Sequence, residues 1–324
     1  MSTTCFFSIA TGSHVALSVA LFESALAHFD KAGCEPEQFL FFLGCDGSLP
    51  STMMGDVHVV HVESIIDSVL IARLEDLYTP AEFCWVLKPF VFRWLLDQFD
   101  AVFYFDSDGW ITGSFDEFVV ELGDSPILLT PHYLEPFGCV SECGVRALSL
   151  LRGGVFNAGF LAVNRSDQAF HFLHWWADHV CRHGRNDPDN GMCGDQRWLD
   201  LVPALFPVTK VSRHPGINVG YWNIHERVVT QIDGTYFVNG ERLLFLHLSG
   251  FDKNNPLAFS SHLPQFTAGG ALAGLLREYA ERLDAAQLGL VGFHPVYTYR
   301  RWWHHFVKPY RWLLDLFKNP RSCR

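Results

Sequence analysis

The chain has 324 residues, a hydrophobic content of 49% and a formal net charge of −11 at pH 7. A chain of this length and apolar content can bury a large core, which excludes an intrinsically disordered protein. The acidic charge argues against general affinity for nucleic acid, so no nucleic-acid partner is expected. The charge is uneven, because residues 298–324 carry seven Lys/Arg and one Asp, which leaves −17 on residues 1–297.

The first 22 residues contain no charged side chain, which raises the question of a signal peptide or a membrane span. The stretch has no basic start and is interrupted by Ser, Thr, His and Gly, so we predict a strand over 5–10 and a helix from Val15 to Phe29. No other segment is long and apolar enough to span a bilayer. Nine cysteines, an odd number without a signal sequence, indicate a reducing cytoplasm.

Apolar runs alternate with helical patterns along the rest of the chain, which predicts a mostly parallel α/β sheet with helices on both faces. Further strands are expected at 38–46, 57–62, 101–105, 126–132, 155–164 and 242–250. A helix is expected over 87–99, with Pro89 in its first turn. Ser166 can cap another helix that ends at Gly184, and a short helix is expected over 195–202.

Two carboxylates follow the strand at 101–105, in the stretch FYFDSDGW (103–110). Side chains two residues apart on an extended segment point to the same side, so Asp106 and Asp108 can meet at one cation. The carboxyl end of a strand is where ligands bind in open α/β sheets, and hard oxygen ligands favour Mg²⁺ or Mn²⁺. Because such a cation can bridge a diphosphate, these residues predict a metal clamp for a nucleotide.

Three other interpretations of the aspartates stay open. A calcium loop that starts at Asp106 would have Glu117 as its last ligand, but it has Ile111 where the sharp turn requires Gly. A strand that ends in Asp-x-Asp also resembles the nucleophile motif of haloacid dehalogenase phosphatases, although no later acidic pair is evident for their Mg²⁺. Both aspartates could instead be solvated turn residues.

Five segments, in order, resemble a GT-A fold glycosyltransferase, close to glycosyltransferase family eight (the glycogenin and LgtC-like enzymes) or a bacterial sister family. They are SIATGSHVALSVALFESALAHF (8–29), LKPFVFRWLLDQFDAVFYFDSD (87–108), FNAGFLAVN (156–164), GDQRWL (194–199) and FLHLSGFDKNNP (245–256). The resemblance implies a GT-A catalytic domain over 1–265, with a Rossmann-like, mixed and mostly parallel sheet. It leaves 266–324 as a C-terminal helical extension with a basic aromatic tail.

The resemblance also implies three groups of site residues. Those expected to contact the nucleotide and its phosphates are Ala10, Thr11, Lys88, Asp106, Ser107, Gly250 and Lys253. Those expected to bind the metal are Asp106, Asp108 and His247. Those expected to act in catalysis, by holding the donor sugar or stabilising the departing diphosphate, are Asn157, Asp195 and Lys253.

The implied activity is that of a metal-dependent hexosyltransferase that takes a sugar from a nucleotide sugar, a UDP-sugar, with retention at the anomeric carbon. Its cofactor would be Mn²⁺ or Mg²⁺, and its acceptor a glycan, a lipid-linked molecule or another hydroxyl compound. Loops around 132–153 and 212–240 are expected to shape the acceptor site. The alternatives are a haloacid-dehalogenase-like phosphatase and a non-catalytic nucleotide-sugar-binding protein of the same fold.

The tail at 298–324 combines aromatic and basic residues at near-helical spacing. Such a segment suits an anionic membrane surface, which predicts peripheral contact with the inner face of the membrane. The same aromatic residues could instead pack on the catalytic domain. The two alternatives differ in whether these aromatic side chains are exposed to solvent.

Overall fold

The computed structural model describes residues 3–29, 36–43, 45–46, 56–136, 140–290 and 296–297. The basic tail at 298–324, for which membrane contact and packing were both predicted as alternatives, lies outside these ranges. Within them, every helix is too short or too polar to cross a lipid bilayer.

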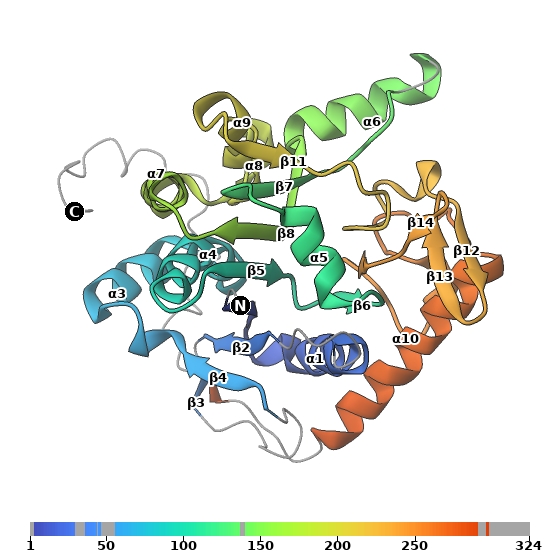
Figure 1. The fold of residues 1–324 in the computed structure, drawn as a ribbon, viewed down its shortest axis with the longest axis horizontal. Coiled ribbons are helices and arrows are strands. Elements are labelled where there is room, and N and C mark those ends of the chain that lie inside the picture. The colour runs from blue at the N-terminus through green and yellow to red at the C-terminus, as the bar shows by residue number, and fades with distance from the viewer. Residues whose placement is uncertain are drawn as a thin grey trace.

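A seven-stranded sheet with the order β11-β7-β8-β5-β1-β2-β4 forms the centre of the described chain (Figure 1). Its strands are β1 (Thr4–Ala10), β2 (Glu37–Phe42), β4 (His58–His61), β5 (Ala101–Phe105), β7 (Ile127–Pro131), β8 (Phe156–Asn164) and β11 (Thr209–Val211). Within this sheet β8 runs antiparallel to its neighbours β5 and β7, and the other strands share one direction. The predicted mixed, mostly parallel α/β fold is therefore confirmed.

Helices cover both faces of this sheet (Figure 1). One face packs against α3 (Ser68–Leu77), α4 (Pro80–Leu96) and α7 (Asp167–His183). The other face packs against α1 (Val15–Phe29) and α5 (Phe115–Leu122). The central strand β5 serves both cores, because Tyr104 belongs to the first and its neighbours Phe103 and Phe105 to the second.

The remaining elements surround this core. Short pairs are formed by β3 (Cys45–Asp46) with β16 (Val296–Tyr297), by β9 (Asn186–Asp187) with β10 (Met192–Cys193), and by β6 (Gly109–Ile111) with β15 (Phe245–His247). A three-stranded sheet contains β12 (Val229–Ile232), β13 (Thr235–Val238) and β14 (Glu241–Arg242). The other helices are α6 (Val140–Gly153), α8 (Gln196–Leu199), α9 (Val202–Leu205) and α10 (Gly270–Gly289). Of these, α10 packs against α1.

The start of α4 differs from the prediction. The helix expected over 87–99 begins at Pro80, because Thr79 and Glu82 form a reciprocal capping box there. Pro89 is consequently inside the helix and not in its first turn, which is a correction to the sequence analysis. The ring nitrogen of Pro89 cannot donate to the carbonyl of Trp85, so one helical hydrogen bond is missing where α4 approaches the site.

The strand expected over 242–250 is divided into β14 and β15, and the second part sets the geometry of the site. β15 pairs antiparallel with β6, and this register places His247 opposite Gly109. The backbone N–H of Leu248 then donates to the carbonyl of Asp108 at 2.8 Å. A segment distant in sequence is thereby fixed beside the two aspartates that follow β5.

The helix cap predicted at Ser166 gives a test of local stability. Ser166 Oγ accepts a hydrogen bond from the backbone N–H of Ala169 at 3.1 Å, at the start of α7. We expect Ser166→Ala to lower the free energy of unfolding by about 1 kcal/mol. Ser68→Ala, at the exposed first residue of α3, should change it by less than about 0.5 kcal/mol. Urea unfolding measures both, and equal effects would contradict the capping role.

Candidate functional site

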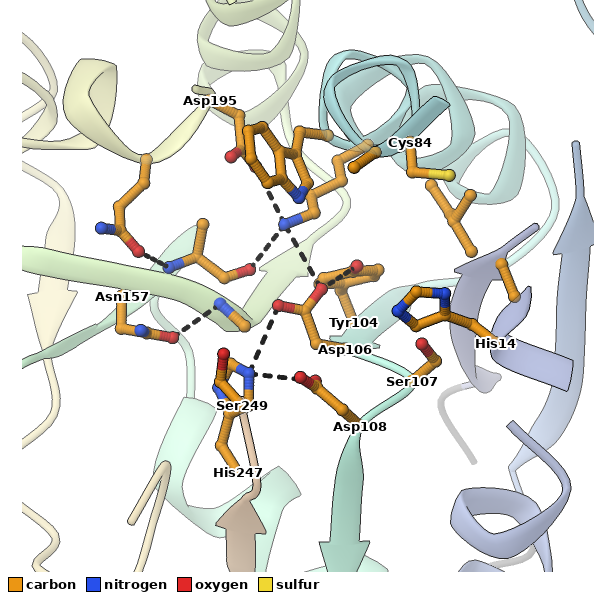
Figure 2. Close-up of a pocket in the computed structure, with 18 of the residues that line it drawn as sticks. His14, Cys84, Tyr104, Asp106, Ser107, Asp108, Asn157, Asp195, His247 and Ser249 are labelled. Atoms are coloured by element: carbon orange, nitrogen blue, oxygen red, sulfur yellow. Dashed lines mark hydrogen bonds and ion pairs between the residues drawn. The ribbon is translucent and has the colours of Figure 1, made fainter. Parts of the chain in front are cut away.

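A cavity of about 640 Å³ opens where β1 and β5 end and β8 begins (Figure 2). This is the carboxyl edge of the parallel strands, where the sequence placed a ligand site. The predicted site residues that line the cavity are Ala10, Thr11, Lys88, Asp106, Ser107, Asp108, Asn157, Asp195 and His247. The structure therefore brings together residues from all five of the sequence segments that carry the resemblance.

Asp106, Asp108 and His247 form a cluster in which one ligand atom from each lies within 4.8 Å of the others. His247 Nε2 is 3.1 Å from Asp108 Oδ1 and 3.6 Å from Asp106 Oδ2. The imidazole and both carboxylates point toward one another in Figure 2. Two oxygen donors and one nitrogen donor at this spacing are a fitting set for a divalent cation.

The ionisable groups of this cluster shift one another's pKa values. Burial by itself would raise the pKa of Asp108, but His247 outweighs burial and holds that pKa below its ordinary value. Burial would likewise lower the pKa of His247, but Asp108 and then Asp106 raise it above its ordinary value. A proton and a divalent cation therefore compete for the same atom, His247 Nε2.

Lys88 lies at the centre of the polar cluster and is 1% exposed. Its Nζ is 2.9 Å from Asp195 Oδ2, 3.5 Å from Asp106 Oδ1 and 3.0 Å from the carbonyl of Ala158. Burial would lower the pKa of Lys88, yet Asp106 and Asp195 outweigh burial and raise it. The ammonium is thus charged, and it joins the metal-binding aspartate to the second buried carboxylate.

Asp195 is 3% exposed and stands immediately before α8. Its side chain makes no capping hydrogen bond to that helix, so capping does not explain its position. Burial raises the pKa of Asp195, and the nearby ammonium of Lys88 opposes this shift without reversing it. The carboxyl group is held in the cavity by Lys88 and is available to a ligand hydroxyl.

Several cavity residues were not predicted from the sequence. They are Ser13, His14, Cys84, Trp85, Tyr104 and Ser249. His132, Tyr221 and Trp222 also line the cavity and belong to the loops at 132–153 and 212–240 that were expected to shape the acceptor site. Strand alternation could have identified Tyr104, which lies two residues before Asp106 and donates its O–H to that carboxylate. His132 directly follows β7, so the strand-end argument applied to Asp106 could have identified it as well.

Two of the predicted donor-binding residues do not line this cavity. Lys253 Nζ contacts Asp284 and Gln287 of α10, and the loop that carries it turns toward that helix. Gly250 has φ +71° and is enclosed by side chains of the segment that follows the loop. Contact of either residue with a diphosphate stays a prediction, because the described geometry does not bring them to the site.

The calcium-loop interpretation of the aspartates is wrong. Glu117, which would be the last ligand of that loop, accepts from the backbone N–H of Ser114 at 2.9 Å and caps α5. Its Oε2 is also 3.4 Å from Arg242 Nη1. Glu117 is therefore engaged at the start of a helix and does not share a cation with Asp106.

Gly159 is required by the position of His247. A Cβ at residue 159 would lie 2.1 Å from His247 Cε1 and 2.3 Å from its Nδ1. We expect Gly159→Ala to displace the imidazole and weaken Mn²⁺ binding by about 10- to 100-fold, the range found when the support of a metal ligand is lost. Isothermal titration with Mn²⁺ measures this. Gly274→Ala on α10, whose added Cβ meets only Tyr236 Oη at 3.9 Å, is the control and should bind normally.

His132 gives a pH-dependent test. Burial lowers the pKa of His132 to about 4, below the ordinary value of 6.5 that applies in the unfolded chain. Between these values the unfolded chain binds a proton that the folded chain does not, so stability falls as pH falls. We expect a loss of up to about 2 kcal/mol in unfolding free energy between pH 7 and pH 5. His132→Gln should remove this part of the loss, whereas His61→Gln, at an exposed histidine, should retain it.

No protein-family model matches the chain. It is similar to two Bacillus subtilis proteins, both named only as uncharacterized. It is 25% identical to YfnF over 259 residues, which cover 77% of this chain and 82% of YfnF. It is 24% identical to YfnD over 261 residues, which cover 78% of this chain and 79% of YfnD.

The chain is also similar to solved structures of sugar transferases. The galactosyltransferase LgtC has 14% identity and a TM-score of 0.48, covering 85% of this chain and 95% of LgtC. The glycosyltransferase GlyE of Streptococcus pneumoniae has 15% identity and a TM-score of 0.45, and the match covers 90% of this chain and 64% of GlyE. Mouse xyloside xylosyltransferase 1 has 16% identity and a TM-score of 0.42, and the match covers 65% of this chain and 85% of the mouse enzyme. These similarities are to the fold of the three enzymes and agree with the resemblance seen in the sequence.

Proposed function

We propose that this chain is a metal-dependent glycosyltransferase that binds a nucleotide sugar, namely a UDP-sugar, and transfers its sugar to a hydroxyl acceptor. The observation that carries the proposal is the convergence of two clusters in one cavity. Asp106, Asp108 and His247 supply ligands for a cation, and the Lys88–Asp195 pair continues directly from Asp106. A diphosphate at the first cluster would hold its sugar beside the second.

The donor set supports Mn²⁺ or Mg²⁺ as the cofactor. Asp106, Asp108 and His247 would hold the ion, since carboxylate oxygens suit hard cations and one imidazole adds a ligand without adding charge. The bound cation would supply positive charge that stabilises a departing diphosphate. Tyr104 assists from the chain itself, because its O–H donates to Asp106 and fixes the orientation of that carboxylate.

Lys88 acts on the donor through its neighbours. An ammonium has three protons, and three acceptors already surround Nζ, namely Asp195, Asp106 and the carbonyl of Ala158. Lys88 therefore orients the two carboxylates and balances part of their charge. This refines the direct contact with the donor that the sequence resemblance implied.

Asn157 has a restricted role toward a sugar. Its Oδ1 already accepts from the backbone N–H of Gly159 at 2.8 Å and from Asn218 Nδ2 at 3.0 Å. Toward a ligand in the cavity, the amide can therefore only donate through Nδ2. Asp195, as a carboxylate, can only accept a hydrogen bond. The two residues would therefore select a sugar with one hydroxyl that accepts from Asn157 and another that donates to Asp195.

The acceptor side is supported by aromatic residues of the 212–240 segment. Tyr221 and Trp222 both line the cavity, and the Trp222 ring meets His247 edge to face with centroids 5.0 Å apart. Half-buried aromatic rings in the wall of a polar cavity suit a sugar ring, which favours a glycan acceptor. Retention at the anomeric carbon stays a prediction that NMR of the product would test.

Asp108→Asn tests the metal site. The substitution keeps the shape of the side chain but removes one negative charge from the cation cluster. We expect Mn²⁺-dependent hydrolysis or transfer of UDP-sugars to fall by at least about 100-fold, roughly 3 kcal/mol in activation free energy. The stabilisation of the protein against heat by UDP with Mn²⁺ should also be lost. Asp124→Asn, at an exposed aspartate outside the cavity, is the control and should behave as wild type.

Two results would contradict the proposal. Full activity of Asp108→Asn in the presence of a chelator would show that these aspartates do not hold a required cation. Binding of a nucleotide sugar with Mn²⁺, without hydrolysis or transfer across a panel of donors and acceptors, would favour the non-catalytic binding protein instead.

A further inference from the structure

We propose that Asn218 is a positioning residue, which relays the orientation of the Asn157 amide to His247 through one chain of hydrogen bonds and so sets the protonated nitrogen of His247. The inference deepens the proposed function, because it concerns how the cation ligand and the sugar-binding amide are prepared together. Asn218 is 1% exposed and lies behind both residues. The sequence analysis had indicated only the 212–240 loop that contains it and had not singled out this residue.

The first end of the chain is fixed by a backbone donor. The N–H of Gly159 can only donate, so the atom of Asn157 that lies 2.8 Å from it must be the oxygen Oδ1. The atom of Asn218 that lies 3.0 Å from the same oxygen must then be Nδ2. This leaves Asn218 Oδ1 facing His247 Nδ1 at 3.0 Å, so Nδ1 carries the proton. In a neutral His247, the Nε2 atom that faces Asp108 consequently carries no proton.

The second end is fixed by a backbone acceptor. The carbonyl of Val155 lies 3.3 Å from His132 Nδ1 and can only accept, so Nδ1 of His132 carries a proton. His132 Nε2 then accepts from Asn157 Nδ2 at 3.2 Å. This orientation of the Asn157 amide is the same one that Gly159 requires. Two independent backbone groups therefore agree on every donor and acceptor between His132 and His247.

The backbone around Asn218 explains why it sits at this point. Its φ is +57°, a conformation that asparagine adopts more readily than most other residues. The next residue, Val219, bridges to Leu246 of β15, and the N–H of His247 donates to the carbonyl of Val219 at 2.7 Å. Asn223 Nδ2 also donates to the carbonyl of Asn218 at 3.2 Å. The segment is thus held against the strand that carries His247.

The chain links two functions that would otherwise be separate. A cation needs the unprotonated Nε2 of His247, and a sugar hydroxyl needs the free N–H of Asn157. Reversal of the Asn218 amide would present its N–H₂ group to His247 and its oxygen to Asn157 Oδ1. Both contacts would then be mismatched, so a single side chain links the orientation of Asn157 to the tautomer of His247.

The test compares Asn218→Gly with Asn239→Gly. Glycine accepts positive φ without strain, so both variants delete a side chain at a left-handed position, and only Asn218 touches the site. With Mn²⁺ alone as the probe, we expect Asn218→Gly to bind about 10- to 100-fold more weakly than wild type in isothermal titration. Asn239→Gly should bind as wild type does.

A spectroscopic measurement separates positioning from mere structural support. In ¹⁵N NMR of imidazole groups at alkaline pH, the wild-type protein should show His247 and His132 each with the proton on Nδ1. The His247 signal is assigned by its absence in His247→Gln. In Asn218→Gly, the signal of His247 should move toward a mixture of the two tautomers.

The outcomes are decisive in each case. An Nε2-protonated His247 or His132 in the wild-type protein would overturn the inference even if Asn218→Gly failed to fold. Wild-type Mn²⁺ affinity and an unchanged His247 tautomer in Asn218→Gly would overturn it as well. If the wild-type protein binds no Mn²⁺, the proposed function fails, and the NMR measurement still decides whether the hydrogen-bond chain is ordered as inferred.

Discussion

The site depends on one short antiparallel pairing, between β6 and β15. It joins segments far apart in the chain and sets His247 opposite Gly109, immediately after Asp108. Without it, the strand that ends at the two aspartates would offer only two carboxylates to a cation. The close approach in turn requires glycine at 159, because a side chain there would occupy the space of the imidazole. The pairing of the two backbone segments therefore positions the side chains that form the cation cluster.

The charges in the cavity make a divalent cation physically reasonable. Among the described residues that line it, Asp106, Asp108 and Asp195 are acidic and Lys88 is the basic residue outside the histidines. With neutral histidines, these side chains sum to −2 in a partly buried site, where uncompensated charge is costly. Lys88 offsets part of this cost between Asp106 and Asp195. A cation with two positive charges at the other end of Asp106 would balance the remainder.

The sequence predicted the parts of the site that follow from local patterns. The strand before Asp106 was visible as an apolar run, and period-two alternation put Asp106 and Asp108 on one side. The start of α4 was also encoded locally, since Thr79-Pro80-Ala81-Glu82 is a capping-box pattern, and the interpretation that began the helix at 87 overlooked it. Asn218 was different, because its role arises from a left-handed backbone and from contact with a strand that follows much later in the chain. For Lys253 the motif indicated the residue but not the direction in which its loop turns, and the loop carries Lys253 to Asp284 of α10.

The hydrogen-bond chain also constrains what the cavity can recognise. Since backbone groups fix the sense of every donor and acceptor from His132 to His247, the cavity cannot adjust to a ligand by amide reversal without breaking contacts elsewhere. Asn157 must donate to the ligand and Asp195 must accept from it. For the proposed glycosyltransferase, a donor sugar that lacks either hydroxyl would leave a buried polar group unpaired, which costs about 1 to 3 kcal/mol. Selectivity for the donor in the proposed function would therefore come from a rigid polar framework, whose order is set by backbone groups and passed through Asn218 to His247.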